Sequence, residues 1–240
     1  MWYFINIATM VIILPGLIFA LYAQFRVNST FKKYSKVSTE QGSTAREVAY
    51  YLLSRNGCPT NIETIPGKLT DHYNPKTKVL ALSQSTYNST SVAAIAVAAH
   101  EVGHATQDNE DHFLLKFRSK MVPFVNIGSY LAFPLAILGV FLEYASSVSV
   151  ESIGTLLIAL GVLLYSLSTI FSLVTLPVEI NASSRALKML TAGGYVSEKE
   201  KNQMRYVLYT AALTYVADLV VSLLYLLRFL VLLAHMRDRD

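Results

Sequence analysis

The chain has almost no cysteine: Cys58 is the only one in its 240 residues. A single cysteine excludes an internal disulfide and any cysteine-rich metal knuckle, and it is consistent with a reducing compartment. The sequence also shows no internal repeat, low-complexity tract or hinge-like linker.

Charge is scarce as well. Charged residues make up 15% of the chain and hydrophobic residues 53%, with a mean hydropathy of +0.41, which is too apolar for a soluble domain of this size. A helix needs about 20 apolar residues to cross a bilayer, and four runs are long enough: residues 2–25, 121–142, 148–176 (interrupted by Glu151) and 206–227. The sequence therefore predicts a multi-pass protein of the cell membrane.

No basic residue precedes the first run, and four basic residues follow it between positions 26 and 36. This order favours an uncleaved anchor with its N-terminus outside over a signal peptide. Twelve of the twenty basic residues lie between 26 and 120 and five between 185 and 205, whereas the connector 143–151 has none. The polar blocks 26–120 and 177–205 are thus predicted to be cytoplasmic, with both chain ends outside.

The basic residues have the bilayer as their expected partner. Their excess is explained by topology and by contact with anionic lipid. No basic cluster is interleaved with aromatic residues as a nucleic-acid surface would require, so no nucleic-acid partner is predicted.

The first polar block contains three predicted elements. Apolar residues recur at helical spacing over 44–55, and Asn56-Gly57-Cys58-Pro59 ends this helix. Residues 78–83 form a short strand by composition. A second helix is expected over 91–107, with Asn88, Ser89 or Ser91 able to cap it.

The second helix carries the stretch AAHEVGHAT, residues 98–106. Four residues advance a helix by little more than one turn, so His100 and His104 project from one face and can bind one metal ion. Glu101 then points beside them toward a bound water. Two imidazoles with a neighbouring carboxylate suit zinc (Zn2+). A chance grouping on a surface helix is the alternative, which five histidines in the whole chain make uncommon.

A zinc site of this kind needs a third protein ligand. His72 and His112 have the right chemistry, but Glu179 is favoured because the chain crosses the membrane twice between 120 and 177 and so returns to the same side. Pro177 is predicted to begin a new helix, in whose first turn Glu179 would be favourably placed even without a metal.

Several separated blocks resemble the bacterial YugP-type neutral zinc metallopeptidases over about residues 65–227. They are LTDHYNP (69–75), VAAIAVAAHEVGHA (92–105), VPFVNIG (122–128), LPVEINASSRA (176–186) and AALTYV (211–216). The resemblance implies a membrane-bound gluzincin in which His100, His104 and Glu179 are the zinc ligands and Glu101 is the general base.

One position departs from the wider glutamate-zincin pattern, which places an aspartate four residues after the ligand glutamate to orient a histidine. This chain has Ser183 there. A serine hydroxyl accepts an imidazole N–H without bringing a charge, and either Ser183 or Asn181 is a candidate to orient a histidine.

The predicted fold is a mainly α membrane protein of about four transmembrane helices with a small cytosolic α+β, zincin-like catalytic unit. It divides into an N-terminal anchor (1–25), a catalytic segment carrying HEVGH (26–120), a transmembrane hairpin (121–176), a segment carrying the third ligand (177–205), and a C-terminal transmembrane helix with a short tail (206–240).

The predicted function is hydrolysis of peptide bonds near the cytosolic membrane surface, in a peptide or membrane-protein substrate. The strand near 79–83 either pairs with an extended peptide or only covers the metal helix. Tyr73, His72, Arg185 and Tyr195 are candidates to stabilise the oxyanion, and none is favoured. An adaptor protein and the oligomeric state stay open.

Two other functions are considered. A site-2-type intramembrane protease carries its histidine motif in a membrane span, but the apolar run before His100 has only eight residues. A non-catalytic zinc-containing membrane scaffold would keep the same residues. Asp218, within the last apolar run, is expected to face the bundle or a wet cavity because lipid contact is costly.

Overall fold

The computed structural model describes residues 2–145 and 151–237. These residues fall into two compact units formed from interleaved parts of the chain. The helical unit comprises Met1–Tyr22, Phe117–Leu176 and Tyr215–Asp240, and the mixed unit comprises Ala23–Lys116 and Pro177–Thr214. Each unit is described by itself.

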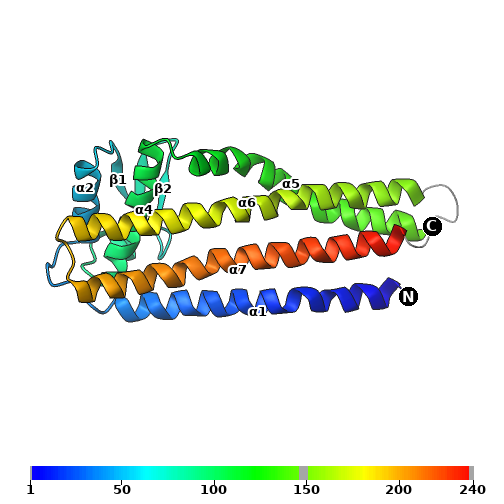
Figure 1. Ribbon diagram of the computed structural model, residues 1–240, viewed down its shortest axis with the longest axis horizontal. Helices are drawn as coiled ribbons and strands as arrows, with labels where there is room; N and C mark the ends of the chain where they lie inside the picture. The colour runs from blue at the N-terminus through cyan, green and yellow to red at the C-terminus, as the bar shows by residue number, and fades with distance from the viewer. Residues whose placement is uncertain (1, 146–150, 238–240) are drawn as a thin grey trace. The chain divides into compact units, whose positions relative to one another are not determined.

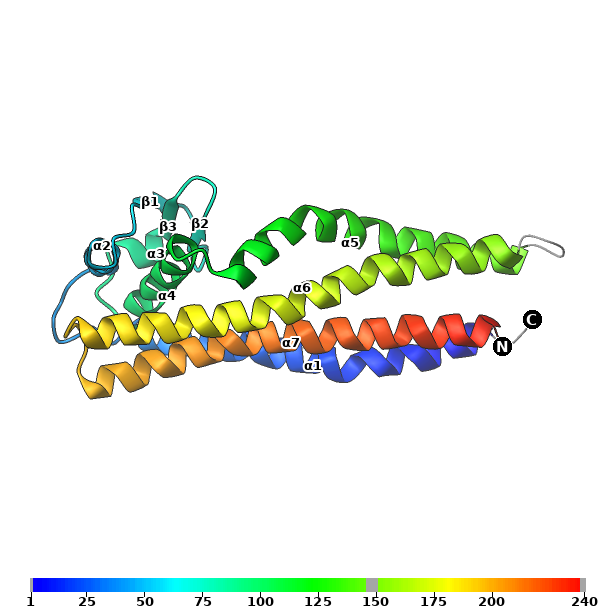
Figure 2. The same ribbon diagram turned by 45° about the horizontal axis from the view of Figure 1, so that its top comes forward.

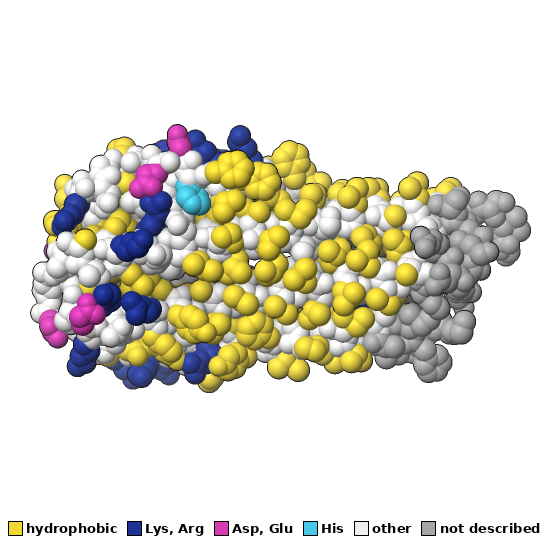
Figure 3. Space-filling view, viewed as in Figure 1, with side chains coloured by type: hydrophobic (Ala, Val, Ile, Leu, Met, Phe, Trp, Pro, Cys, Tyr) yellow, Lys and Arg dark blue, Asp and Glu magenta, His cyan; other side chains and the backbone are white. Residues whose placement is uncertain are grey.

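Four long helices supply the helical unit: α1 (Trp2–Tyr34), α5 (Phe113–Ala145), α6 (Glu151–Ala192) and α7 (Glu198–Arg237). Among the described residues, these four are long and apolar enough to cross a membrane. The unit turns large hydrophobic side chains outward, as the face in Figure 3 shows, and they include Ile18, Leu21, Tyr130, Ile137, Leu156 and Leu163. Such a surface is suited to lipid. The prediction of a mainly α membrane protein with four spans is confirmed.

The helices do not end where the apolar runs end. Helix α1 continues past residue 25 to Tyr34, and α6 runs through Pro177 without a break. The prediction that Pro177 begins a new helix is therefore wrong. A proline removes a single backbone N–H, and a long helix packed among neighbours tolerates that loss.

Asp218 is exposed. Of its two expected surroundings, the bundle interior is therefore wrong, and the wet cavity stays a prediction.

The mixed unit contains α2 (Ala45–Arg55), β1 (Asn61–Ile65), β2 (His72–Asn74), β3 (Val79–Ser83), α3 (Gln84–Tyr87) and α4 (Val92–Asn109), with the adjoining ends of α1, α6 and α7. Helices α2 and α4 share its hydrophobic core with β3, as Figure 2 lets the reader follow. The largest fully buried side chains of this core include Leu52, Leu80, Leu82, Val92, Leu190 and Met204.

The predicted helices of this unit are confirmed, and of the three cap candidates for the second helix, Ser91 is the cap. Thr44 caps α2 in a capping box, in which its hydroxyl accepts from Glu47 N and the Glu47 carboxylate accepts from Thr44 N. Ser91 caps α4 by accepting from Ala94 N. Polar hydroxyls thus satisfy backbone donors that have no partner within the first turn.

The strands form one sheet in the order β1-β3-β2, with β1 parallel and β2 antiparallel to β3. The predicted strand is therefore the central one. The prediction that an extended peptide pairs with this strand is wrong. Strand β1 pairs with all five residues of β3 on one edge, and β2 pairs with Val79–Ala81 on the other.

Candidate metal centre

The helix that carries the HEVGH stretch is buried on nearly all sides. Fourteen of the eighteen residues of α4 are buried, because small side chains let the neighbouring elements approach closely. On α6, the buried residues Val178, Ala182 and Ala186 belong to the same unit. Rigid packing of this kind holds side chains in fixed positions.

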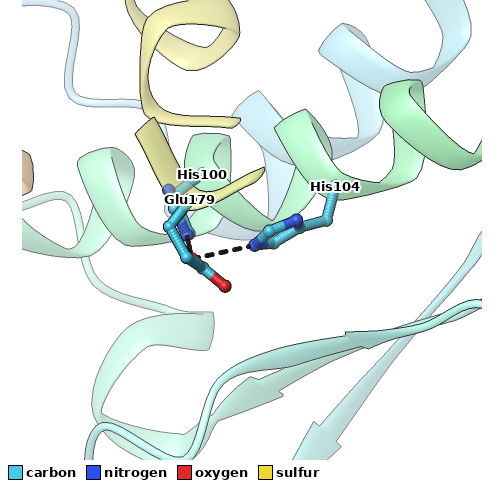
Figure 4. Close-up of side chains that lie close together, drawn as sticks. All are labelled: His100, His104 and Glu179. Carbon is cyan, nitrogen blue, oxygen red and sulfur yellow. Dashed lines mark hydrogen bonds and ion pairs between the residues drawn. The ribbon is translucent and has the colours of Figure 1, made fainter. Parts of the chain in front are cut away.

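His100, His104 and Glu179 come together from α4 and α6 (Figure 4). Their ligand atoms all lie within 4.8 Å of one another. Nε2 of His100 is 3.1 Å and Nε2 of His104 is 3.2 Å from the same oxygen, Oε2 of Glu179. The three side chains are largely shielded from solvent, with relative side-chain exposures of 14%, 10% and 3%. Of the three candidates for the third ligand, the structure brings only Glu179 to the histidines.

The donor set fits zinc by chemistry and by spacing. Two imidazole nitrogens and a carboxylate oxygen are common zinc ligands, and bonds of about 2.0–2.2 Å in a tetrahedron place neighbouring ligand atoms about 3.3–3.6 Å apart. The nitrogen–oxygen distances of 3.1 and 3.2 Å are close to that spacing.

The second ring nitrogen of each histidine, Nδ1, has its own hydrogen-bond partner. That partner is on α6 for His100 and on α4 for His104. Nδ1 of His100 lies 3.1 Å from the Ser183 hydroxyl, and Nδ1 of His104 lies 3.0 Å from Oε1 of Gln107. The Gln107 amide in turn donates to Asn181 Oδ1. Both positions considered for orienting a histidine are therefore involved, Ser183 directly and Asn181 through Gln107.

Sequence reasoning missed Gln107. It lies three residues after His104, and residues so spaced are neighbours on a helix surface. That spacing was the available signal. A polar side chain with no exposed surface also needs a hydrogen-bond partner.

Glu101 is buried beside the cluster. One of its carboxylate oxygens, Oε2, accepts a hydrogen bond of 3.0 Å from the backbone N–H of Tyr73 in β2. The pKa of the Glu101 carboxyl is raised to about 7. Burial is the largest cause, His100 and the Tyr73 N–H lower the pKa, and the carboxylates of Glu179 and Asp71 add to the rise.

The remaining candidates have other contacts. Exposed His72 lies with Nδ1 3.0 Å from Thr70 O, and neither His72 nor His112 belongs to the cluster. The Tyr73 hydroxyl donates to Asp108 Oδ2 at 2.6 Å. Tyr195 packs on the Tyr51 ring with centroids 4.7 Å apart.

Arg185 is held by two side chains. Its Nε donates to Asn181 Oδ1 at 2.8 Å, and Nη1 pairs with Glu110 Oε2 at 2.7 Å. These contacts tie its guanidinium to α6 and to the end of α4.

The chain is similar to known proteins described as peptidases. Residues 9–234 match the sequence profile of a family described as "Putative neutral zinc metallopeptidase". The chain is 44% identical over 223 residues to the "Putative membrane protease YugP" of Bacillus subtilis (strain 168), covering 92% of this chain and 94% of that protein. No solved structure matches the chain. Zinc, the cofactor predicted from the sequence, is the metal of the matching family.

Proposed function

Because the chain belongs to the family of neutral zinc metallopeptidases, we propose that it is a membrane-embedded endopeptidase that hydrolyses peptide bonds near the cytosolic membrane surface. The observation that carries this proposal is the convergence of His100, His104 and Glu179 from two distant segments, with Glu101 beside them. A carboxylate next to a histidine-rich metal site is an arrangement that suits metal-assisted hydrolysis of an amide.

His100, His104 and Glu179 would hold the zinc. When bound there, zinc supplies a Lewis acid that polarises the scissile carbonyl and lowers the pKa of a water from 15.7 to about 7. Three protein ligands leave a fourth position for water or substrate, which is typical of catalytic rather than structural zinc sites.

Glu101 acts as the general base in this proposal. It takes a proton from the attacking water and later delivers that proton to the leaving amine. The Tyr73 N–H fixes one of its oxygens, Oε2, so that Oε1 is the oxygen left to move the proton.

Strand β2 is the edge strand that offers backbone groups to a substrate. It pairs on one side with β3, and the Tyr73 N–H points instead to Glu101. In an antiparallel strand the N–H and C=O of one residue point to the same edge. The Tyr73 carbonyl on that edge would accept a hydrogen bond from an extended peptide beside Glu101.

The cytosolic side is supported by the distribution of basic residues, since seventeen of twenty lie in 26–120 and 185–205. The two segments that form the site lie in the polar blocks 26–120 and 177–205, which contain these basic residues. A membrane-protein or membrane-associated substrate follows from the apolar helices α5 and α6, which continue into the mixed unit.

The site-2-type alternative is disfavoured by α4. That helix packs with α2 and the sheet in the mixed unit, and it is not one of the four helices suited to span a membrane. A site-2-type protease would carry the histidines in such a span.

The test uses the full-length protein purified in detergent and loaded with zinc, acting on fluorescence-quenched unfolded peptides. Glu101→Gln, at equal zinc content, should lose about 10²- to 10⁴-fold in peptide hydrolysis. Equal hydrolysis by this variant would remove Glu101 as the base. A zinc-loaded wild-type protein that cleaves no peptide would instead favour the scaffold.

A further inference from the structure

A continuous chain of hydrogen bonds leads from His104 to an arginine that the proposed mechanism does not use. His104 Nδ1 lies 3.0 Å from Gln107 Oε1. Gln107 Nε2 is 2.9 Å from Asn181 Oδ1, which is in turn 2.8 Å from Arg185 Nε. All four residues belong to the mixed unit, and Gln107 has no exposed surface.

The arginine fixes the direction of every bond in this chain. A guanidinium only donates hydrogen bonds, so the Asn181 atom that faces Arg185 must be the amide oxygen. That same oxygen faces Gln107, whose side chain must therefore present its amide nitrogen. The Gln107 nitrogen also donates to the backbone carbonyl of Val178 at 2.9 Å, so two acceptors together hold Gln107 in this orientation.

The orientation of Gln107 then determines which ring nitrogen of His104 carries the proton. With its nitrogen engaged by two acceptors, Gln107 can only turn its oxygen toward His104. An amide oxygen accepts, so Nδ1 of His104 must carry the proton. In the neutral ring, the lone pair is then on Nε2, the atom that lies 3.2 Å from Glu179.

We propose that Arg185, acting through Asn181 and Gln107, is a positioning residue that holds His104 in the Nδ1–H tautomer with Nε2 ready to bind zinc. This inference rests on the proposed zinc site. It assigns a function to three residues that touch neither substrate nor reacting atoms.

The other histidine provides an internal comparison. His100 has the Ser183 hydroxyl at Nδ1, and a hydroxyl can donate or accept. Serine therefore leaves the tautomer of His100 open, whereas the arginine-anchored amides determine that of His104.

The His104 tautomer depends on the hydrogen bond that Arg185 donates to Asn181, and not on the ion pair between Arg185 and Glu110. The Glu110 partner has a side chain that is 57% exposed, and exposed pairs contribute little. Glu110→Gln should therefore leave zinc affinity and the His104 tautomer unchanged. Arg185→Lys keeps a side chain that only donates, and should stay closer to wild type than Arg185→Gln, whose amide can either donate or accept.

The decisive variants are at Asn181. Asn181→Leu has a similar shape but no acceptor, whereas Asn181→Asp accepts from both Arg185 and Gln107. Full-length protein with ¹⁵N-labelled histidine is studied in detergent, and the His104 signals are assigned by their loss in His104→Ala. Nitrogen shifts report the tautomer in zinc-free protein, and competition with a chromophoric chelator reports zinc affinity.

Asn181→Leu should mix the two tautomers of His104 and weaken zinc binding about 10- to 100-fold, while Asn181→Asp should retain both properties. Rescue by aspartate excludes general misfolding as the cause. A single Nδ1–H tautomer and unchanged affinity in Asn181→Leu would overturn the inference and leave the zinc site intact. Wild-type protein that binds no zinc would overturn the proposed function itself, whatever the tautomer.

Discussion

Gly103 lies so close to the backbone of Ala182 that a Cβ atom on Gly103 would be 2.4 Å from the Ala182 carbonyl oxygen. Gly103 precedes the proposed ligand His104, and Ala182 lies three residues after the proposed ligand Glu179. The contact between them therefore sets how closely the two ligand-bearing helices approach. A methyl group at this point would push α4 away from α6.

Gly103→Ala should lower the stability of the protein and its zinc content. Alanine favours a helix by about 1 kcal/mol over glycine, so helix propensity alone would raise stability. Overpacking a close contact costs about 1–3 kcal/mol or more, and here the obstacle is a backbone carbonyl that cannot rotate away. The melting temperature in detergent and the zinc content check the sign. An increase in both would show that α4 and α6 have room to separate.

The sequence predicted the parts of this site that are local in the chain. HEVGH needs only the helical repeat to bring His100 and His104 together, and Ser91 is recognised as a cap candidate from neighbouring residues. The amide of Gln107 meets Asn181 only because α4 packs on α6, more than seventy residues away. That packing depends on the Gly103 contact, which no local pattern reveals.

Strands β1 and β2 were not predicted, for a related reason. The side chains of β1 are exposed or half-buried throughout, and β2 has three residues. Neither gives the alternation of apolar and polar residues that marks a strand. Their structure comes from pairing with the buried β3.

The zinc content of purified variants distinguishes the proposed metal ligands from the proposed general base. Purified wild-type protein should hold about one zinc per chain. Alanine at His100, His104 or Glu179 should lower occupancy strongly, because each substitution removes a ligand atom, whereas Glu101→Gln should retain the metal. Alanine at His72 or His112 serves as the matched control and should retain it too. Full occupancy in Glu179→Ala, measured by metal analysis, would exclude that residue as a ligand.

Tyr73 links the edge strand to the metal helix through its hydroxyl bond to Asp108. Tyr73→Phe leaves Asp108 with Lys78 as its remaining partner and loosens β2, whose backbone N–H holds Glu101. A hydrogen bond to a charged group contributes about 1.5–3 kcal/mol, so peptide hydrolysis should fall about tenfold or more at unchanged zinc content. Tyr195→Phe, away from the sheet, should keep full activity. Equal rates of peptide hydrolysis for Tyr73→Phe and Tyr195→Phe would show that the anchoring of β2 does not affect catalysis.

Topology can be read from single cysteines in a chain whose own Cys58 is replaced by alanine. Exposed Gln84 in the mixed unit and Ser147, which lies outside the described residues, are each changed to cysteine. An impermeant thiol reagent on intact cells should label only position 147, because the basic blocks hold the mixed unit inside. Permeabilised cells provide the control in which both react. Labelling at 84 in intact cells would place the site outside.

The proposed position of the site near the bilayer leads to a prediction of which substrates the proposed peptidase cuts. Glu179 follows the apolar run that ends at 176 by three residues on one unbroken helix, a rise of about 5 Å. Substrates anchored in the same membrane therefore meet the site at high effective concentration.

Cleavage should then depend on distance from the membrane more than on sequence. A flexible reporter segment is fused at increasing distances from a membrane anchor and reconstituted with the enzyme in vesicles, with Glu101→Gln as the blank. The rate should fall steeply as the site moves away from the bilayer, because the tethered segment spends less time within reach. A soluble reporter of the same sequence, at matched concentration, should be cut slowly. Equal cleavage of the soluble reporter would contradict selection by proximity while leaving the peptidase chemistry in place.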